Sequence, residues 1–272
     1  MNAFPWPIFL TLLATGILCT LAVIPYSLAL NPDVLEILKQ KQAARSSPIP
    51  PALIVVFASL VQGGLLVAVA LYLGLLASRA VGLGLPVLQA ALSGQPFVEH
   101  LLTILPVSLL VGFAGGALIL VIEQTVFRPR LPIQFRQAVV KSTRFWNRLL
   151  ACFYGGIVEE ILMRLLLFAG LAWLFGLVWK SPSGGPALGA FILANIISNV
   201  LFGLGHLPTT KRLTPLTPLV ITRAVVLNSL IGLGCGFLFM AYGLEAAIIA
   251  HFSADIVIHL IGPAVLKDQA TI

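Results

Sequence analysis

Three charged residues lie in the middle of an apolar stretch that is long enough to cross a lipid bilayer. The stretch runs from Leu149 to Trp179 and contains Glu159, Glu160 and Arg164. One charged side chain near the centre of a membrane helix costs about 2.5–3.5 kcal/mol on insertion scales. On a helix, Glu160 and Arg164 share a face and can pair, whereas Glu159 points about 100° away and needs a partner from another element. The pattern fits either a structural ion pair with Glu159 as a snorkelling neighbour, or a functional carboxylate at Glu159 beside that pair.

A second polar row lies in the apolar stretch Ala187–Leu207. Asn195, Asn199, Phe202 and His206 are spaced four, three and four residues apart, which places them on one face of a helix. Because polar groups avoid lipid, we expect this face to point into a helix bundle. The asparagines are either interhelical hydrogen-bonding groups or neighbours of a site that includes His206.

A third group lies in the stretch Leu244–Gly262, where His251 and Asp255 are one helical turn apart. The carboxylate can hold the imidazole in one orientation, or both side chains can bind a metal ion. His259 lies one turn further on, and we interpret it as an interfacial residue. A carboxylate with two histidines can activate water and stabilise a developing negative charge.

The elements that would position these groups are membrane helices. Hydrophobic residues make up 59% of the 272 residues and charged residues only 9%, whereas a soluble domain has about 25% charged residues. A span needs about 20 apolar residues, so the sequence predicts an all-α polytopic membrane helix bundle of seven spans. The predicted spans are Ile8–Leu30, Pro51–Ser78, His100–Ile122, Leu149–Trp179, Ala187–Leu207, Leu219–Met240 and Leu244–Gly262. The short stretch Ala80–Ala91 makes eight helices the alternative count.

Basic residues alternate between the loops. They follow the first, third and fifth predicted spans, as at Lys41, Arg136 and Lys211, while the other loops hold only Arg79 and Lys180. Because cytoplasmic loops are enriched in Lys and Arg, this alternation predicts an N-terminus outside and a C-terminus in the cytoplasm. If the host is a prokaryote, the membrane would be the cell membrane.

The chain divides into three predicted parts. Residues 1–126 hold the first three spans, residues 127–148 form a basic amphipathic segment on the cytoplasmic membrane surface, and residues 149–264 hold the polar groups described above. The net charge of +7 is carried mainly by loops between spans, so the expected partner of the basic residues is the lipid bilayer and not a nucleic acid.

Three short motifs together resemble a known family. Glu159-Glu160-x-x-x-Arg164, Phe202-x-x-x-His206 and His251-x-x-x-Asp255 are similar to the motifs of the CAAX protease and bacteriocin-processing (CPBP) family, which includes the type II CAAX prenyl endopeptidases. The resemblance covers Leu149 to Gly262, and the first three spans match nothing recognisable. It implies an intramembrane endopeptidase of the CAAX prenyl protease 2 type. Its substrate would be a membrane-bound peptide or lipidated protein, prenylated or not, cut near the C-terminus. The alternative is a non-catalytic transporter or bacteriocin-immunity-type binding protein that uses the same polar cavity.

The resemblance also implies roles for single residues. Glu159 would be the general base and would share the catalytic water with His206, while His251 and Asp255 would form the oxyanion site. The supporting residues would be Glu160, Arg164, Asn199 and Phe202.

At position 255 the chain departs from the eukaryotic pattern, which has asparagine there. An ionised Asp255 cannot donate a hydrogen bond to an oxyanion, so it would have to be protonated, orient His251 or bind a metal ion. We favour a mechanism with no cofactor and no metal. The alternative is zinc held by Glu159, His206 and His251, which is the ligand set of many catalytic zinc sites.

Overall fold

The computed structural model describes residues 3–31, 33–44, 49–133, 135–136 and 143–267, and within these residues it contains helices and no β-strand. Six stretches of the described residues are long and apolar enough to cross a membrane. They are α1 (Trp6–Ala22) with α2 (Ile24–Leu30), α4 (Pro51–Ala80), α6 (Val98–Ile122), α10 (Leu188–Gly205) with α11 (Leu207–Lys211), α12 (Pro218–Tyr242), and α13 (Leu244–Asp255) with the turn that follows it. The predicted all-α polytopic bundle is confirmed.

A further long helix carries the first charged motif. It runs without a break through α8 (Phe145–Phe153), η3 (Tyr154–Glu159), η4 (Ile161–Phe168) and α9 (Ala169–Gly176). It is not one of the six because Glu159, Glu160 and Arg164 lie in its middle. Including it, the long helices of the described chain number seven, as expected. The stretch behind the alternative count of eight contains α5 (Pro86–Leu92), which is too short to span a bilayer.

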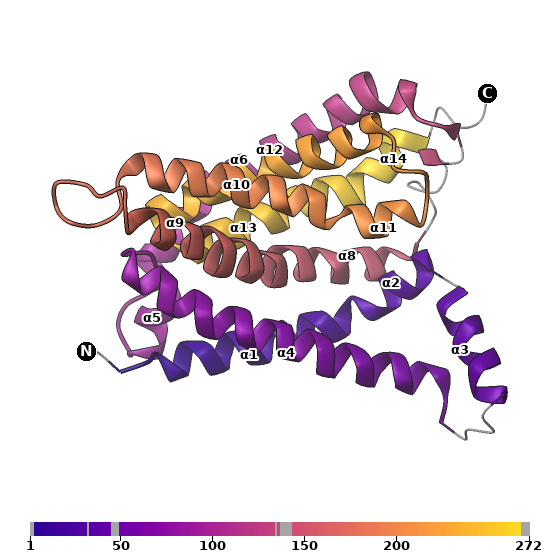
Figure 1. Cartoon of the computed structure of the whole chain (residues 1–272), viewed down its shortest axis with the longest axis horizontal. Coiled ribbons are helices and arrows are strands. Elements are labelled where there is room, and N and C mark those ends of the chain that lie inside the picture. Colours follow the sequence, from indigo (N-terminus) through magenta and orange to yellow (C-terminus); the bar gives the residue numbers. More distant parts are fainter. Residues whose placement is uncertain (1–2, 32, 45–48, 134, 137–142, 268–272) are drawn as a thin grey trace.

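The long helices lie side by side along the long axis of the molecule (Figure 1). The helix α8–α9 lies between the pair α1 and α4 on one side and the group α6, α10, α12 and α13 on the other. Helices α2, α3 (Asp33–Ala43), α11 and α14 (Gly262–Lys267) lie at one end, and α5 lies at the other with the N-terminus. Lys41 and Lys211, from two of the predicted cytoplasmic loops, are therefore at the same end. Of the predicted amphipathic segment 127–148, residues 134 and 137–142 lie outside the described residues.

Prolines and one glycine fix where several helices begin and end. Pro51, Pro86 and Pro218 are the first residues of α4, α5 and α12, a position that needs no backbone N–H. Between α12 and α13 the chain turns at Gly243, whose φ of 96° is readily available only to glycine. The last two spans therefore form a tight helical hairpin.

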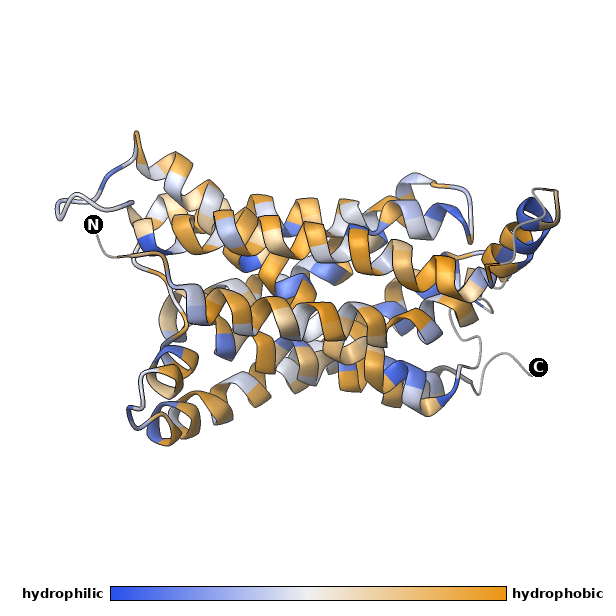
Figure 2. Cartoon of the chain, turned by 90° about the horizontal axis from the view of Figure 1, so that it is seen from below, coloured by the Kyte–Doolittle hydropathy of each residue, from blue (hydrophilic) through white to orange (hydrophobic). Residues whose placement is uncertain are grey.

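Small residues allow the helices around the central helix to approach closely. A Cβ atom at Gly116 of α6 would meet the backbone of Ala254 in α13 at 2.9 Å, and one at Gly74 of α4 would meet the backbone of Leu165 in η4 at 2.7 Å. Such close backbone approach is typical of helix contacts in membranes, where van der Waals packing drives association. The outer surface has the opposite character, because large apolar side chains such as Leu65 and Leu110 are exposed. Figure 2 shows apolar residues along the length of the helices and hydrophilic residues mainly toward their ends.

Candidate active site

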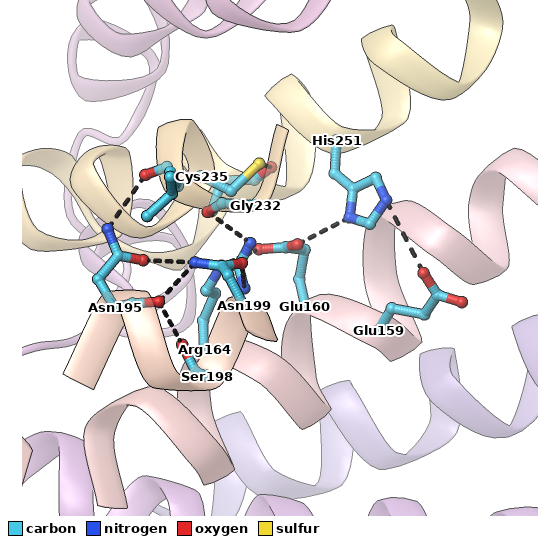
Figure 3. A network of polar contacts seen from close by, with 11 residues as sticks. Glu159, Glu160, Arg164, Asn195, Ser198, Asn199, Gly232, Cys235 and His251 are labelled. Atoms are coloured by element: carbon cyan, nitrogen blue, oxygen red, sulfur yellow. Dashed lines mark hydrogen bonds and ion pairs between the residues drawn. The ribbon is translucent and has the colours of Figure 1, made fainter. Parts of the chain in front are cut away.

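The two neighbouring glutamates of the central helix contact the same imidazole. Glu160 Oε1 lies 2.7 Å from His251 Nδ1, and Glu159 Oε2 lies 3.8 Å from His251 Nε2 (Figure 3). Glu159 closes the π-helical turn η3, and a second π-helical stretch, η4, begins just after Glu160. Hydrogen bonds from residue i to i+5 widen the helix and reduce the angle between successive side chains, and such turns often occur at functional sites. The partner that Glu159 needed from another element is therefore His251.

Glu160 also pairs with Arg164 of its own helix, as the spacing predicts. Arg164 Nε lies 3.0 Å from Glu160 Oε2, in an ion pair whose two side chains are both fully buried. The second oxygen of Glu160 accepts the Nδ1–H of His251. The Glu160 carboxylate is therefore held on one side by a guanidinium and holds the imidazole on the other.

Arg164 is itself anchored by two other helices. Its Nη2 donates to the carbonyl oxygen of Gly232 in α12 at 2.9 Å, and its Nη1 donates to Asn199 Oδ1 in α10 at 3.4 Å. Asn199 Nδ2 in turn donates to the side-chain oxygen of Asn195 at 2.8 Å. A Cβ atom at Gly232 would overlap Asn199 Oδ1, so glycine is needed there for the contact. The polar face of α10 points into the bundle, and its asparagines link helices and position Arg164 (Figure 3).

Asp255 lies near the other nitrogen of His251. Its Oδ1 is 3.8 Å from His251 Nε2 and 3.9 Å from His259 Nε2, one turn further on. The hydrogen bond that fixes the His251 ring therefore comes from Glu160, whereas Asp255 makes a longer electrostatic contact. Gly155 of η3 faces Asp255, and a Cβ atom there would overlap Asp255 Oδ2. This glycine lets the central helix approach the carboxylate.

His206 reaches the same region from the end of α10. Its Nδ1 lies 2.9 Å from the carbonyl oxygen of Phe202, so Nδ1–H donates there and Nε2 is left as an acceptor. The ring of Phe202 packs edge-on against both histidines, with centroids 4.7 Å from His206 and 6.0 Å from His251. Phe202 therefore sets the spacing between the two imidazoles.

The four residues that the resemblance marks as catalytic line one cavity of about 570 Å³. Glu159 comes from the central helix, His206 from the end of α10, and His251 and Asp255 from α13. Glu160, Arg164 and Asn199 are fully buried and lie behind these four residues. We call the cavity of about 570 Å³ the catalytic cavity. Its other walls come from α2, α6, α11 and α12.

No three histidine, cysteine, aspartate or glutamate side chains of the described residues are arranged to hold a metal ion. The zinc alternative therefore has no preformed ligand set in this part of the chain and stays a prediction, as does the metal-free mechanism.

Two further features were not anticipated from the sequence. Glu123, in a π-turn (η1, Glu123–Phe127) after α6, forms an ion pair of 2.7 Å with Arg223 of α12, whose guanidinium lies over the ring of Phe135. The sequence has an acid at the end of the third span and an arginine at the start of the sixth, but nothing in their spacing predicts that Glu123 and Arg223 form this ion pair.

Tyr26 and Tyr154 also line the catalytic cavity.

Comparison with known proteins agrees with the motifs. Residues 141–257 match the family model described as type II CAAX prenyl endopeptidase Rce1-like. The expected membership of the CAAX protease family is thus confirmed for this part of the chain. No curated protein and no solved structure matches the chain.

Proposed function

We propose that this protein, whose residues 141–257 belong to the CAAX prenyl endopeptidase family, hydrolyses a peptide bond near the C-terminus of a membrane-associated substrate. The observation that carries the proposal is that the polar residues of three separate helices, Glu159, His206 and His251, line a single cavity. In hydrocarbon each of them would be costly, and a shared wet cavity removes much of that cost.

In the proposed mechanism Glu159 is the general base. A water molecule between Glu159 and His206 Nε2 loses a proton to the carboxylate while its oxygen attacks the carbonyl carbon of the scissile bond. The tetrahedral oxyanion forms beside His251 and Asp255. When the carbon–nitrogen bond breaks, the proton passes from Glu159 to the leaving nitrogen, and the products are a carboxylic acid and an amine.

The buried network supports His251 in this mechanism. Because Nδ1–H donates to Glu160, the ring is held with Nε2 directed toward the cavity. A second proton on Nε2 would give an imidazolium that can donate to the oxyanion, and the nearby carboxylates of Glu159 and Asp255 would balance its charge. Arg164 holds the Glu160 side chain in place through their ion pair, so it acts through Glu160 and not on the substrate.

We place the catalytic cavity toward the cytoplasmic half of the membrane. His206 and Arg212 line it at the end of the bundle that holds α11, and the basic loops gather at that end. Cysteines introduced at positions 41 and 211 should therefore not be modified by a reagent added outside the cell. Modification of either would show that the protein has the opposite orientation in the membrane.

The decisive experiment compares proteins trimmed in cells that carry the wild type and Glu159→Gln. Loss of the general base should slow cleavage by about 10²–10⁴-fold while the protein stays folded, because glutamine keeps the shape. Glu99→Gln, a change of an exposed glutamate at the far end of α6, is the matched control and should cleave normally. Cleavage unaffected by Glu159→Gln would overturn the proposed mechanism. An altered ion flux or ligand binding with no cleavage by the wild type would favour the non-catalytic alternative.

A further inference from the structure

A second cavity opens beside the catalytic cavity, between α2 and α4. It has a volume of about 450 Å³ and shares Val23, Ser27, Asn31, Tyr154 and Arg212 with the catalytic cavity. Its outer wall is the face of α4 from Val55 to Leu66. We call it the α2–α4 groove. The groove and the catalytic cavity, which Glu159 lines, therefore lie side by side and share part of their walls.

The α4 wall of the groove carries polar groups that the membrane alone does not explain. Ser59 and Gln62 are three residues apart on a helix face that also presents Val55 and Leu66. The most apolar 18-residue window of this span has a mean hydropathy of 2.4. Gln62 is exposed, and an amide exposed to hydrocarbon is costly. Neither side chain makes a hydrogen bond to another residue in the described part of the chain.

The opposite wall repeats this chemistry at the end of α2. Ser27 and Asn31 line the groove one turn apart, and Asn31 Nδ2 donates to the carbonyl oxygen of Ser27 at 3.0 Å. The side-chain oxygens of both residues remain available as acceptors. Two facing walls thus offer hydroxyl and amide groups, and Tyr154 and Arg212 line the groove where it meets the catalytic cavity.

An extended polypeptide is the ligand that these groups suit. Lipid tails have no hydrogen-bonding groups to offer to Gln62 or Asn31. A peptide segment that is unwound for cleavage has the complementary problem, because its free N–H and C=O groups need partners inside a membrane. We propose that the α2–α4 groove binds, in extended form, the substrate segment on the N-terminal side of the scissile bond. This inference rests on the proposed function, in which cleavage near the C-terminus leaves the long part of the substrate on that side.

The size of the groove predicts how much of the substrate it holds. Val55 to Leu66 is 11 steps along a helix, or about 16 Å at 1.5 Å per residue. An extended peptide rises about 3.3 Å per residue, so the groove holds about five residues. A substrate with fewer than about five residues before the scissile bond should not use it fully.

The test uses the cleavage site that the Glu159→Gln comparison identifies, made as two synthetic peptides with two and with ten residues before the scissile bond. We expect wild type to cleave the long peptide with the lower KM. Gln62→Leu should raise that KM about three- to tenfold with little change in kcat, since a lost hydrogen bond contributes a modest net free energy. The short peptide should be cleaved equally by both proteins, which also shows that the variant folds. Ser59→Ala should act in the same direction but less strongly.

The matched control is Gln89→Leu, the same exchange at an exposed residue near the opposite end of the bundle. It should change the KM of neither peptide. Equal effects of Gln62→Leu on the two peptides, or no effect on the long one, would overturn the inference and leave the proposed function intact. Equal effects on the two peptides would mean that Gln62 has a general role in folding. No effect on the long peptide would mean that lipid, and not substrate, fills the groove. Failure of wild type to cleave either peptide would instead overturn the proposed function.

Discussion

The spans α4 and α13 meet their surroundings in opposite ways. Only 6% of the most apolar part of the α4 span is buried inside the protein, against 50% for the span that begins with α13. Before Arg79, near its end, α4 carries no charged residue, whereas α13 and the turn after it carry Glu245, His251, Asp255 and His259. Both are apolar enough to cross a bilayer, so hydropathy alone does not separate them.

This difference shows where a membrane protein can keep ionisable groups. In lipid a charged side chain has no partner, whereas within the bundle Glu160 meets Arg164 and His251 at short distances. The paired ionisable groups therefore lie in the central helix and α13, whereas α4 offers only uncharged polar groups at the groove. Substitutions in one region test this division when their effect on the other region is measured.

The largest effect is expected from Arg164→Ala. Removing the guanidinium leaves the Glu160 carboxylate buried without its charge partner, and breaking a buried pair from one side costs about 3–5 kcal/mol. The amount of folded protein and its unfolding temperature in detergent should both fall, together with activity. Leu65→Ala, at a lipid-facing position of α4, is the control and should change stability by about 0.5 kcal/mol or less. Normal folding of Arg164→Ala with activity lost only in the chemical step would show that Arg164 takes part in the chemistry.

A smaller effect is expected from Asp255→Asn. The amide has the shape of the carboxylate and can donate to an oxyanion, and the His251 ring keeps its hydrogen bond to Glu160. We expect cleavage to remain within about tenfold of wild type, equivalent to about 1.4 kcal/mol of transition-state stabilisation. If Asp255 were a zinc ligand, the substitution would remove metal and activity together, because an amide is a weaker ligand for zinc. Metal analysis of the purified, active protein before and after the substitution separates the two outcomes.

The sequence by itself determined the features that depend on local helix geometry. Spacing of four residues placed Glu160 beside Arg164 and Asn195 beside Asn199, and the contacts between these pairs are present. The apolar stretches identified the spans because a bilayer requires a fixed length of apolar helix. The motifs, which come from separate spans in a fixed order, pointed to the family whose model matches residues 141–257.

Only the tertiary structure decided which partners from distant elements meet. The sequence placed Asp255 one turn from His251, yet Glu160, 91 residues away in the chain, holds the imidazole. That choice depends on the π-helical turns around Glu159 and on glycines such as Gly155 and Gly232, which let neighbouring side chains approach closely. The pairing of Glu123 with Arg223 and the groove beside Gln62 arise in the same way. Each is set by how helices pack, and packing joins residues whose separation along the chain carries no periodic signal.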